Sequence, residues 1–286
     1  MSNPPVKSWQ LRTRKLEFTP LPCLMAIVNV TPDSFSDGGR FFSVQAAVDQ
    51  ALRLEDEGAG ILDIGGESTR PYSEAVAVDE ELRRVTPVLE ALQGRVSVPI
   101  SIDTSKAKVA AAAIDLGVEI INDVTGLEGD PEMVAVAASS QAGVCAMHMQ
   151  GTPQTMQDRP HYENVVEEIM DYLDQRDKKL IAAGILSERI CLDPGIGFGK
   201  THQHNLDLLK RCEEFHRLQR PILIGHSRKG FIAHVIGSKE RERLFGTIGV
   251  SLALAGKGIQ VLRVHDIRPA REALLLYQAS GGLAKQ

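Results

Sequence analysis

The sequence contains few cysteines, few aromatic residues and no long apolar run, and each shortage excludes a class of protein. Its four cysteines, at positions 23, 145, 191 and 212, match neither CxxC nor zinc-ligand spacing, so we expect buried free thiols and no disulfide framework. Only 5% of the residues are aromatic and a single residue is tryptophan, which leaves no aromatic platform for single-stranded nucleic acid. No apolar run approaches the roughly 18 residues that span a membrane.

The N-terminus and the net charge indicate where the protein is located and which partners it does not bind. The first residues contain no apolar core of a secretory signal, and free cysteines are typical of a reducing compartment, so we expect a cytoplasmic protein. A net charge of −5 and a pI of about 5.9 argue against a nucleic-acid-binding surface. We therefore expect neither a nucleic-acid nor a membrane partner, although local basic residues can still bind a small anion.

Eight short apolar runs recur along the chain, and each is rich in Ile, Val and Leu. Continuous runs of this kind are typical of strands that are buried on both faces of a parallel sheet. They cover residues 24–28, 60–64, 98–102, 118–121, 144–147, 189–192, 221–224 and 259–264. Stretches that predict helices lie between most of them, at 44–57, 79–92, 106–116, 131–141, 162–183, 205–218, 240–255 and 269–278. Pro87 predicts a kink or a late start in the second of these helices.

The alternation of strands and helices predicts the fold class. Eight βα units in a chain of this length indicate an α/β protein with a single TIM (β/α)8 barrel domain. A doubly wound open sheet is the alternative, but no Gly-x-Gly-x-x-Gly follows the first predicted strand. We expect an extended N-terminal lead-in over residues 1–20, the barrel over 21–280 and a frayed C-terminus over 281–286.

All eight predicted strands end on or just before a hydrogen-bonding or charged residue. Each such residue alone could be a helix N-cap, but in a barrel the eight strand ends meet at one face, where active sites lie. Two carboxylates and an amide suit a flat heterocycle with several N–H donors; they are Asp103, Asn122 and Asp193. Basic residues suit a phosphate or a pyrophosphate; they are Arg70, Lys229, Arg263 and His265.

Two polar loops follow the first two predicted strands, at residues 31–39 and 65–71. They could be ordinary connections, but their length and charge favour mobile lids. Three other patterns do not hold. Residues 194–201 lack the first glycine of a P-loop, and the second glycine of 225–230 comes one residue too late for a nucleophile elbow. His202 and His204 have no further metal ligands nearby.

Eight motifs, in this order along residues 24–270, resemble those of the dihydropteroate synthase family of the folate pathway. They are NVTPDSFSDGG at 29–39, DIGGESTRP at 63–71, SIDTSK at 101–106, IINDV at 120–124, MHMQG at 147–151, LDPGIGFGK at 192–200, SRK at 227–229 and RVHD at 263–266. The resemblance implies a TIM barrel, usually a homodimer. It also implies that 6-hydroxymethyl-7,8-dihydropterin pyrophosphate condenses with p-aminobenzoate to give 7,8-dihydropteroate and pyrophosphate.

The resemblance further implies roles for single residues. Those that hold the pterin and act in catalysis are Asp103, Asn122, Asp193 and Lys229, with Met147 packed on the ring. Those that bind pyrophosphate are Asn29, Arg263 and His265, with Mg2+ bridging Asn29 and the phosphates. Those that line the p-aminobenzoate pocket are Phe35, Thr69, Arg70, Pro71 and Phe198, with Ser227 beside them, and Asp33 helps to organise the closed loop.

The charges of these residues predict an SN1-like reaction. An electron-rich pterin can stabilise a cation at its methylene carbon, and Asp103 and Asp193 would stabilise the positive charge that spreads into the ring. Mg2+ and the basic residues would neutralise the departing pyrophosphate. Closed loops would exclude water, which otherwise captures the cation.

Two positions depart from the family pattern, and three other functions compete. Gly230 stands where several relatives carry Ser or Arg, and His226 stands where the family is often apolar or small. A pterin-dependent methyltransferase shares the Asp–Asn–Asp set but has no need of the first loop or of the anion motifs. A Schiff-base aldolase using Lys229, next to Arg228, belongs to another enzyme class. A non-catalytic pterin-binding protein would bind the pterin and release no pyrophosphate.

Overall fold

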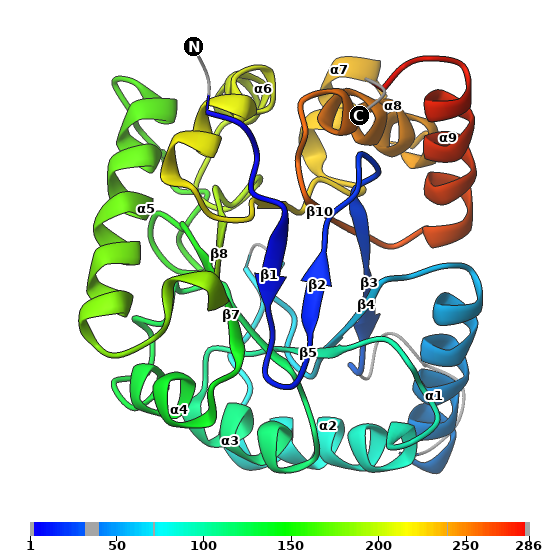
Figure 1. The fold of residues 1–286 in the computed structure, drawn as a ribbon, viewed down its shortest axis with the longest axis vertical. Coiled ribbons are helices and arrows are strands. Elements are labelled where there is room, and N and C mark those ends of the chain that lie inside the picture. The colour runs from blue at the N-terminus through cyan, green and yellow to red at the C-terminus, as the bar shows by residue number, and fades with distance from the viewer. Residues whose placement is uncertain (1–2, 32–39, 71, 239, 284–286) are drawn as a thin grey trace.

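A parallel sheet of eight strands forms the centre of the protein (Figure 1). The computed structural model describes residues 3–31, 40–70, 72–238 and 240–283. The strands lie in the order β8-β7-β6-β5-β4-β3-β10-β9, and a bridge between Leu192 and Ile222 brings the two edges together. Their bounds are β3 Cys23–Asn29, β4 Ile61–Gly65, β5 Ile100–Asp103, β6 Ile120–Asp123, β7 Gly143–Met147, β8 Ile190–Asp193, β9 Leu223–Ile224 and β10 Val261–Val264. The predicted single-domain TIM barrel is therefore confirmed.

Helices surround the sheet on its outer side (Figure 1). They are α1 Arg40–Asp56, α2 Val78–Leu92, α3 Ala107–Asp115, α4 Met133–Ser140, α5 Val165–Ala182, α6 His202–Lys210, α7 Gly230–Ile236, α8 Leu244–Gly256 and α9 Ile267–Ala279, with short 3-10 helices at Ser187–Arg189 and Cys212–Leu218. The prediction of one helix over 205–218 is wrong, because α6 and a 3-10 helix share this segment. The late start expected for α2 is also wrong, since the helix begins at Val78 and continues through Pro87.

Along each strand, side chains point alternately toward the helices and toward the barrel interior, and this alternation positions the site. Inward-facing apolar side chains at the N-terminal ends of the strands form one buried cluster, here called the barrel floor: Met25, Ile61, Ile120, Cys145, Cys191, Leu223 and Val261. Side chains repeat with a period of two along a strand, so the residue two positions further also faces inward. At that level the interior becomes polar, with Asp63, Asn122, Asp193 and Arg263.

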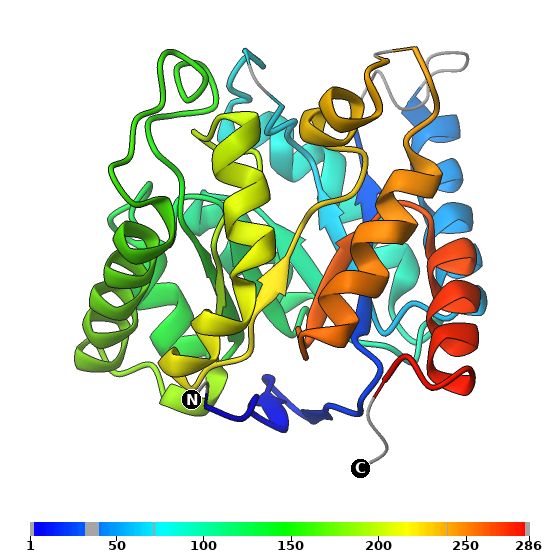
Figure 2. The ribbon, with the colours of Figure 1, turned by 90° about the horizontal axis from the view of Figure 1, so that it is seen from above.

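A β-hairpin near the N-terminus covers the barrel floor. Strands β1 Ser8–Gln10 and β2 Lys15–Glu17 pair antiparallel, and Figure 2 shows them at the end of the barrel opposite the long loops. Trp9 and Leu11 are fully buried against the floor, and the Trp9 indole Nε1 donates to the Arg189 carbonyl at 2.8 Å. The first 20 residues therefore hold a folded hairpin rather than a simple extended lead-in.

The hairpin is expected to contribute to stability through Trp9. Replacing Trp9 by Ala should lower the free energy of unfolding by about 3–5 kcal/mol, because a large buried ring is lost and a cavity remains. Urea unfolding followed by far-UV circular dichroism measures this loss, since the variant has no tryptophan. Lys15→Ala on the exposed strand β2 is the matched control, with a change within about 0.5 kcal/mol. Equal stability of the two variants would contradict the expected role of Trp9.

The cysteines and the C-terminus complete the fold. All four cysteines are free, as expected, and three of them are buried. Burial raises the pKa of the Cys212 thiol to about 12. Among the described helices, none combines the length and the apolar character needed to cross a membrane. Within the predicted frayed segment, Leu283 is buried, and residues 284–286 lie outside the described part of the chain.

Candidate active site

A cavity of about 890 Å³, here called the main cavity, opens at the C-terminal ends of the strands. Many residues predicted for the site line it: Asn29, Thr69, Arg70, Asp103, Phe198, Ser227, Lys229, Arg263 and His265. Asn122, Asp193 and Met147 are buried beside it at the ends of β6, β8 and β7. The other three, Asp33, Phe35 and Pro71, lie outside the described residues. The barrel thus brings together predicted residues that are up to 236 positions apart, from Asn29 to His265.

An ion-pair network forms the inner wall of the main cavity. Arg263 donates from Nε to Asp63 Oδ2 and from Nη2 to Asp103 Oδ2, each at 2.6 Å. Burial raises the pKa of Asp103 to about 7, and the negative charge of Asp63 adds to this rise while Arg263 opposes it. The charges of Asp63 and Asp103 hold the pKa of Arg263 above its ordinary value, although burial acts in the opposite direction. Arg263 is predicted to bind pyrophosphate. In the structure it also binds Asp103, which is predicted to hold the pterin.

Asp193 ends β8 and is held by the glycine-rich turn that follows. Its Oδ1 accepts from the Gly195 amide at 2.7 Å, and burial raises its pKa to about 6. Gly195 has φ +70°, and a Cβ there would lie 1.9 Å from the His148 carbonyl oxygen, so no larger residue fits. Met147 is the neighbour of Asp193 in the strand register and packs with Phe198. This turn therefore sets both a carboxylate and an apolar surface at the cavity.

Lys229 directly precedes α7, and its ammonium group lies over the Phe198 ring, 4.0 Å from the ring centroid. Burial lowers the pKa of Lys229 to about 8, and the charge of Arg263 lowers it further, whereas Asp193 and Asp103 oppose the shift. Gly197 allows the Lys229 stem to pass closely, because a Cβ there would lie 2.9 Å from Lys229 Cδ. Lys229 thus interacts both with the carboxylates of Asp193 and Asp103 and with the Phe198 ring.

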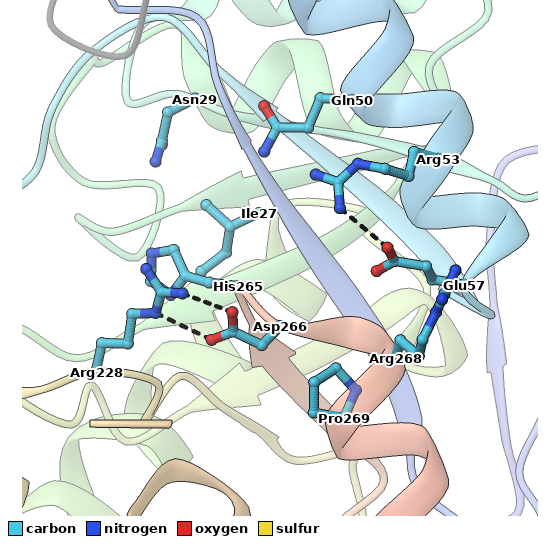
Figure 3. Close-up of a pocket in the computed structure, with 10 residues that line it drawn as sticks. All are labelled: Ile27, Asn29, Gln50, Arg53, Glu57, Arg228, His265, Asp266, Arg268 and Pro269. Atoms are coloured by element: carbon cyan, nitrogen blue, oxygen red, sulfur yellow. Dashed lines mark hydrogen bonds and ion pairs between the residues drawn. The ribbon is translucent and has the colours of Figure 1, made fainter. Parts of the chain in front are cut away.

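A more basic corner lies around Asn29 and His265. A second cavity of about 680 Å³ shares both residues with the main cavity and extends between α1 and the start of α9 (Figure 3). Arg228 lines both cavities and binds Asp266 through two nitrogens, at 3.0 and 2.5 Å. Burial and then the charge of Arg228 lower the pKa of His265 to about 4, so its imidazole is neutral near pH 7. The Ser227 hydroxyl lies 3.0 Å from His265 Nδ1. This corner offers neutral and cationic donors to an anion.

The loop after β4 is anchored by a lysine shared between two glutamates. Lys106 Nζ binds the carboxylates of Glu67 and Glu81, the latter at 2.5 Å. The other oxygen of Glu67 accepts from the Val76 amide at 2.9 Å, which ties the two ends of the loop together. Thr69, between these anchors, lines the main cavity.

The chain matches a family of known proteins over most of its length. The family described as pterin binding enzyme matches residues 25–265. The chain belongs to the pterin binding enzyme family. Dihydropteroate synthase of Haemophilus influenzae is 44% identical over 260 residues, which is 91% of this chain and 94% of that relative. The Neisseria meningitidis serogroup B dihydropteroate synthase is 45% identical over 266 residues, covering 91% of this chain and 93% of the relative.

Solved structures of dihydropteroate synthases are similar to this pterin binding enzyme. The Xanthomonas albilineans enzyme with 4-aminobenzoic acid is 42% identical, with a TM-score of 0.90 over 99% of this chain and 100% of that chain. The same enzyme in complex with 7,8-dihydropteroate is 40% identical, with a TM-score of 0.86 over 97% and 100% of the two chains. These likenesses span the whole barrel and its cavity.

In this pterin binding enzyme, two buried residues beside the predicted ones were missed by the sequence analysis. Asp63 is fully buried and binds Arg263 and Asn122. Lys200 lines the main cavity, donates to the Phe198 carbonyl at 2.8 Å and lies 3.1 Å from His148 Nδ1. Asp63 begins the motif DIGGESTRP and Lys200 ends the motif LDPGIGFGK. A charged residue in an apolar run was the signal that could have identified Asp63.

The two departures from the family pattern have different structural consequences. His226 is buried and faces α8, where its Nε2 lies 2.9 Å from the Ser251 hydroxyl. Burial lowers the pKa of His226 to about 4, so the ring is neutral near pH 7. Gly230 is the first residue of α7 and lines the main cavity without a side chain.

Proposed function

We propose that the protein is a dihydropteroate synthase. It joins the methylene carbon of 6-hydroxymethyl-7,8-dihydropterin pyrophosphate to the amino nitrogen of p-aminobenzoate and releases pyrophosphate. The observation that carries this proposal is one cavity with buried carboxylates on one wall and a basic corner beside it. The identity of about 40% to enzymes solved with 4-aminobenzoic acid and with 7,8-dihydropteroate supports it.

The inner wall suits the pterin. Asp103, Asn122 and Asp193 offer oxygen acceptors for its N–H groups, and Met147 packs against the ring. Lys229 balances the carboxylates and donates to the ring. Lys229 is half-buried and the other residues are buried, so water competes little for their hydrogen bonds.

The basic corner suits the pyrophosphate group. Asn29, His265 and Arg263 bind its oxygens. The donor set around Asn29 fits Mg2+ only together with the substrate, because among the described residues no cluster of three His, Cys, Asp or Glu side chains exists to hold an ion. Mg2+ usually keeps several waters and binds through few protein ligands plus phosphates, which a single Asn29 oxygen permits. When bound, Mg2+ supplies charge neutralisation for the leaving group.

The outer part of the main cavity suits p-aminobenzoate. Phe198 and the stem of Lys229 flank its ring, while Thr69, Arg70 and Ser227 lie at the polar end. Phe35 and Pro71 complete this pocket and Asp33 organises the closed first loop, as the family resemblance implies. With these residues around it, the arylamine nitrogen faces the methylene carbon of the pterin.

The reaction then follows an SN1-like course. The bond between the methylene carbon and the pyrophosphate oxygen breaks, and its electron pair leaves with pyrophosphate. Asp103 and Asp193, when ionised, stabilise the positive charge left on the pterin. The arylamine nitrogen forms the new bond to carbon and then loses a proton to solvent. Closed loops exclude water from the cation.

The pKa values of the site predict a narrow pH optimum. Asp103, with a pKa of about 7, and Asp193, with a pKa of about 6, must be ionised, which requires a pH above these values. Lys229, with a pKa of about 8, must be protonated, which requires a lower pH. The ratio kcat/KM for the pterin substrate should therefore fall below about pH 7 and above about pH 8. Initial rates across buffers of constant ionic strength test this, and a flat profile would contradict it.

A steady-state assay with the pterin pyrophosphate, p-aminobenzoate and Mg2+ tests the function. Formation of 7,8-dihydropteroate with one pyrophosphate per product supports the proposal. A pterin-binding protein without catalysis would bind the substrate and release no pyrophosphate, and an aldolase would be inactivated by borohydride through Lys229. A folded protein that forms no product would overturn the proposal. Methyl transfer to a folate would identify the methyltransferase alternative.

We also propose that the protein forms a homodimer. An exposed apolar surface supports this proposal. Helices α7, α8 and α9 lie side by side (Figure 1) and expose Val235, Phe245 and Leu276 to 63%, 79% and 71%. An apolar surface of this kind is typical of protein–protein contacts. We also propose a cytoplasmic location, which the free cysteines support.

Phe245→Glu is expected to convert the dimer to a monomer. A charge in the centre of an apolar interface loses its hydration without gaining a partner. Sedimentation velocity at micromolar concentration measures the change. Ile181→Glu, at an exposed apolar position on α5, is the matched control and should remain dimeric. If the wild-type protein is monomeric, or if both variants dimerise, this surface is not the interface.

A further inference from the structure

Asp63 lies inside the barrel and is not one of the residues that line the main cavity. It lies on β4, two residues beyond Ile61 of the barrel floor, and its side chain is fully buried. One oxygen, Oδ2, accepts from Arg263 Nε at 2.6 Å and from Asn122 Nδ2 at 3.1 Å. These donors stand on β10 and β6, each two strands away from β4 in the sheet order. A single buried oxygen therefore links two walls of the site.

The contact to Asn122 determines which end of its amide is turned away from Asp63. An ionised carboxylate can only accept hydrogen bonds, so the Asn122 group that faces Asp63 must be the NH2 group. The Asn122 carbonyl oxygen then lies at the other end of the amide. Without a carboxylate at position 63, the amide could rotate and present a donor in place of this acceptor.

The contact to Arg263 fixes the guanidinium against Asp103. Nε points to Asp63 and Nη2 to Asp103, so two carboxylates define the plane of the group. Such paired, charge-assisted hydrogen bonds are short and directional. Loss of either carboxylate leaves the guanidinium free to rotate and leaves the other carboxylate less well held.

We propose that Asp63 is a positioning residue that presents the Asn122 carbonyl oxygen to the pterin and holds Arg263 against Asp103. This rests on the proposed dihydropteroate synthase function. Asp63 touches no substrate and acts through Asn122 and Arg263. It should therefore affect the pterin half of the site and leave the p-aminobenzoate half unchanged.

The test compares Asp63→Asn with the matched control Asp177→Asn. Asp177 is also a buried carboxylate that pairs with an arginine, since its two oxygens accept from Arg220 Nε and Nη2 at 2.8 and 3.0 Å, but it lies on α5 outside the barrel interior. Isothermal titration calorimetry with 6-hydroxymethyl-7,8-dihydropterin should show binding to Asp63→Asn weakened by about 10- to 100-fold, as expected when buried partners lose their hydrogen bonds. The KM for p-aminobenzoate should change by less than about threefold. Asp177→Asn should change neither value by more than about threefold.

A double-mutant cycle with Asn122→Ala separates positioning from general destabilisation. If Asp63 acts largely through Asn122, adding Asp63→Asn to Asn122→Ala should weaken pterin binding by a much smaller factor than it does in the wild type. Full additivity of the two effects would overturn the proposal, as would wild-type pterin binding by Asp63→Asn. If Asp63→Asn does not fold, Asp63→Ser is measured against the same criteria. A wild-type protein that neither binds the dihydropterin nor forms product would instead refute the proposed function.

Discussion

Replacing Lys229 by methionine is expected to lower kcat/KM for the pterin pyrophosphate by about 100- to 1,000-fold. Removal of one partner from a buried charge network costs roughly 3–5 kcal/mol, because the remaining charges are left uncompensated. Here the lysine balances Asp193 and Asp103 and also rests on the Phe198 ring. Its loss should therefore weaken the pterin side and deform the arylamine side of the cavity.

Initial rates with each substrate varied in turn measure this effect. Lys178→Met is the matched control, because Lys178 is exposed and pairs only with residues of its own helix, so its rates should equal those of the wild type. Lys229→Arg should not restore activity, since Gly197 leaves space for a slender stem and the bulkier guanidinium would meet the same turn. Rates near the wild-type value in Lys229→Met would remove this residue from the site.

Asp103→Asn is expected to lower kcat/KM for the pterin substrate by about 100-fold or more, the effect of losing one preorganised group at a site of developing charge. The variant keeps the shape of the side chain but loses the negative charge that stabilises the pterin cation. It also loses the ion pair with Arg263 Nη2. Both effects act on the transition state, so kcat should fall more than the affinity for the ground-state pterin.

The pH profile gives a second readout of the same change. The acid limb is the fall of kcat/KM at low pH. If protonation of Asp103 causes this fall, replacing Asp103 should move the limb to lower pH, toward the pKa of Asp193, which is about 6. Asp177→Asn is the control, because Asp177 is a buried carboxylate on α5 that pairs with Arg220, and it should leave the limb in place. A variant with unchanged rates and an unchanged acid limb would refute the assignment of Asp103.

The regular part of the fold could be predicted from local patterns. Each apolar run became a strand within about two residues, since buried parallel strands need no partner outside the repeat to be recognised. The N-terminal hairpin and α7 could not be predicted in this way. Strands of three residues and a helix of seven residues that begins at Gly230 are stabilised by docking rather than by propensity.

Many residues of the candidate site could also be predicted from the sequence, whereas their binding partners could not. Asp103, Asn122 and Asp193 were recognisable because each interrupts or ends an apolar run. Lys229 and His265 were recognisable as basic residues that follow two other strands, and the family motifs added Thr69 and Phe198. The pairing of Arg263 with Asp103 could not be foreseen, because a motif shows which residues occur and not which atoms they bind. The same holds for Lys200, whose contact with His148, 52 positions away, forms only when two loops meet.

Local patterns in the chain were thus sufficient for the barrel, for the polar strand ends and for the family, because periodicity and motifs are properties of neighbouring residues. The partners of the buried charges depended on closure of the barrel. Asp63 binds Asn122 across 59 positions and Arg263 across 200 positions of the chain. Such contacts depend on strand register and barrel closure, which bring distant side chains within hydrogen-bonding distance and which no short segment encodes.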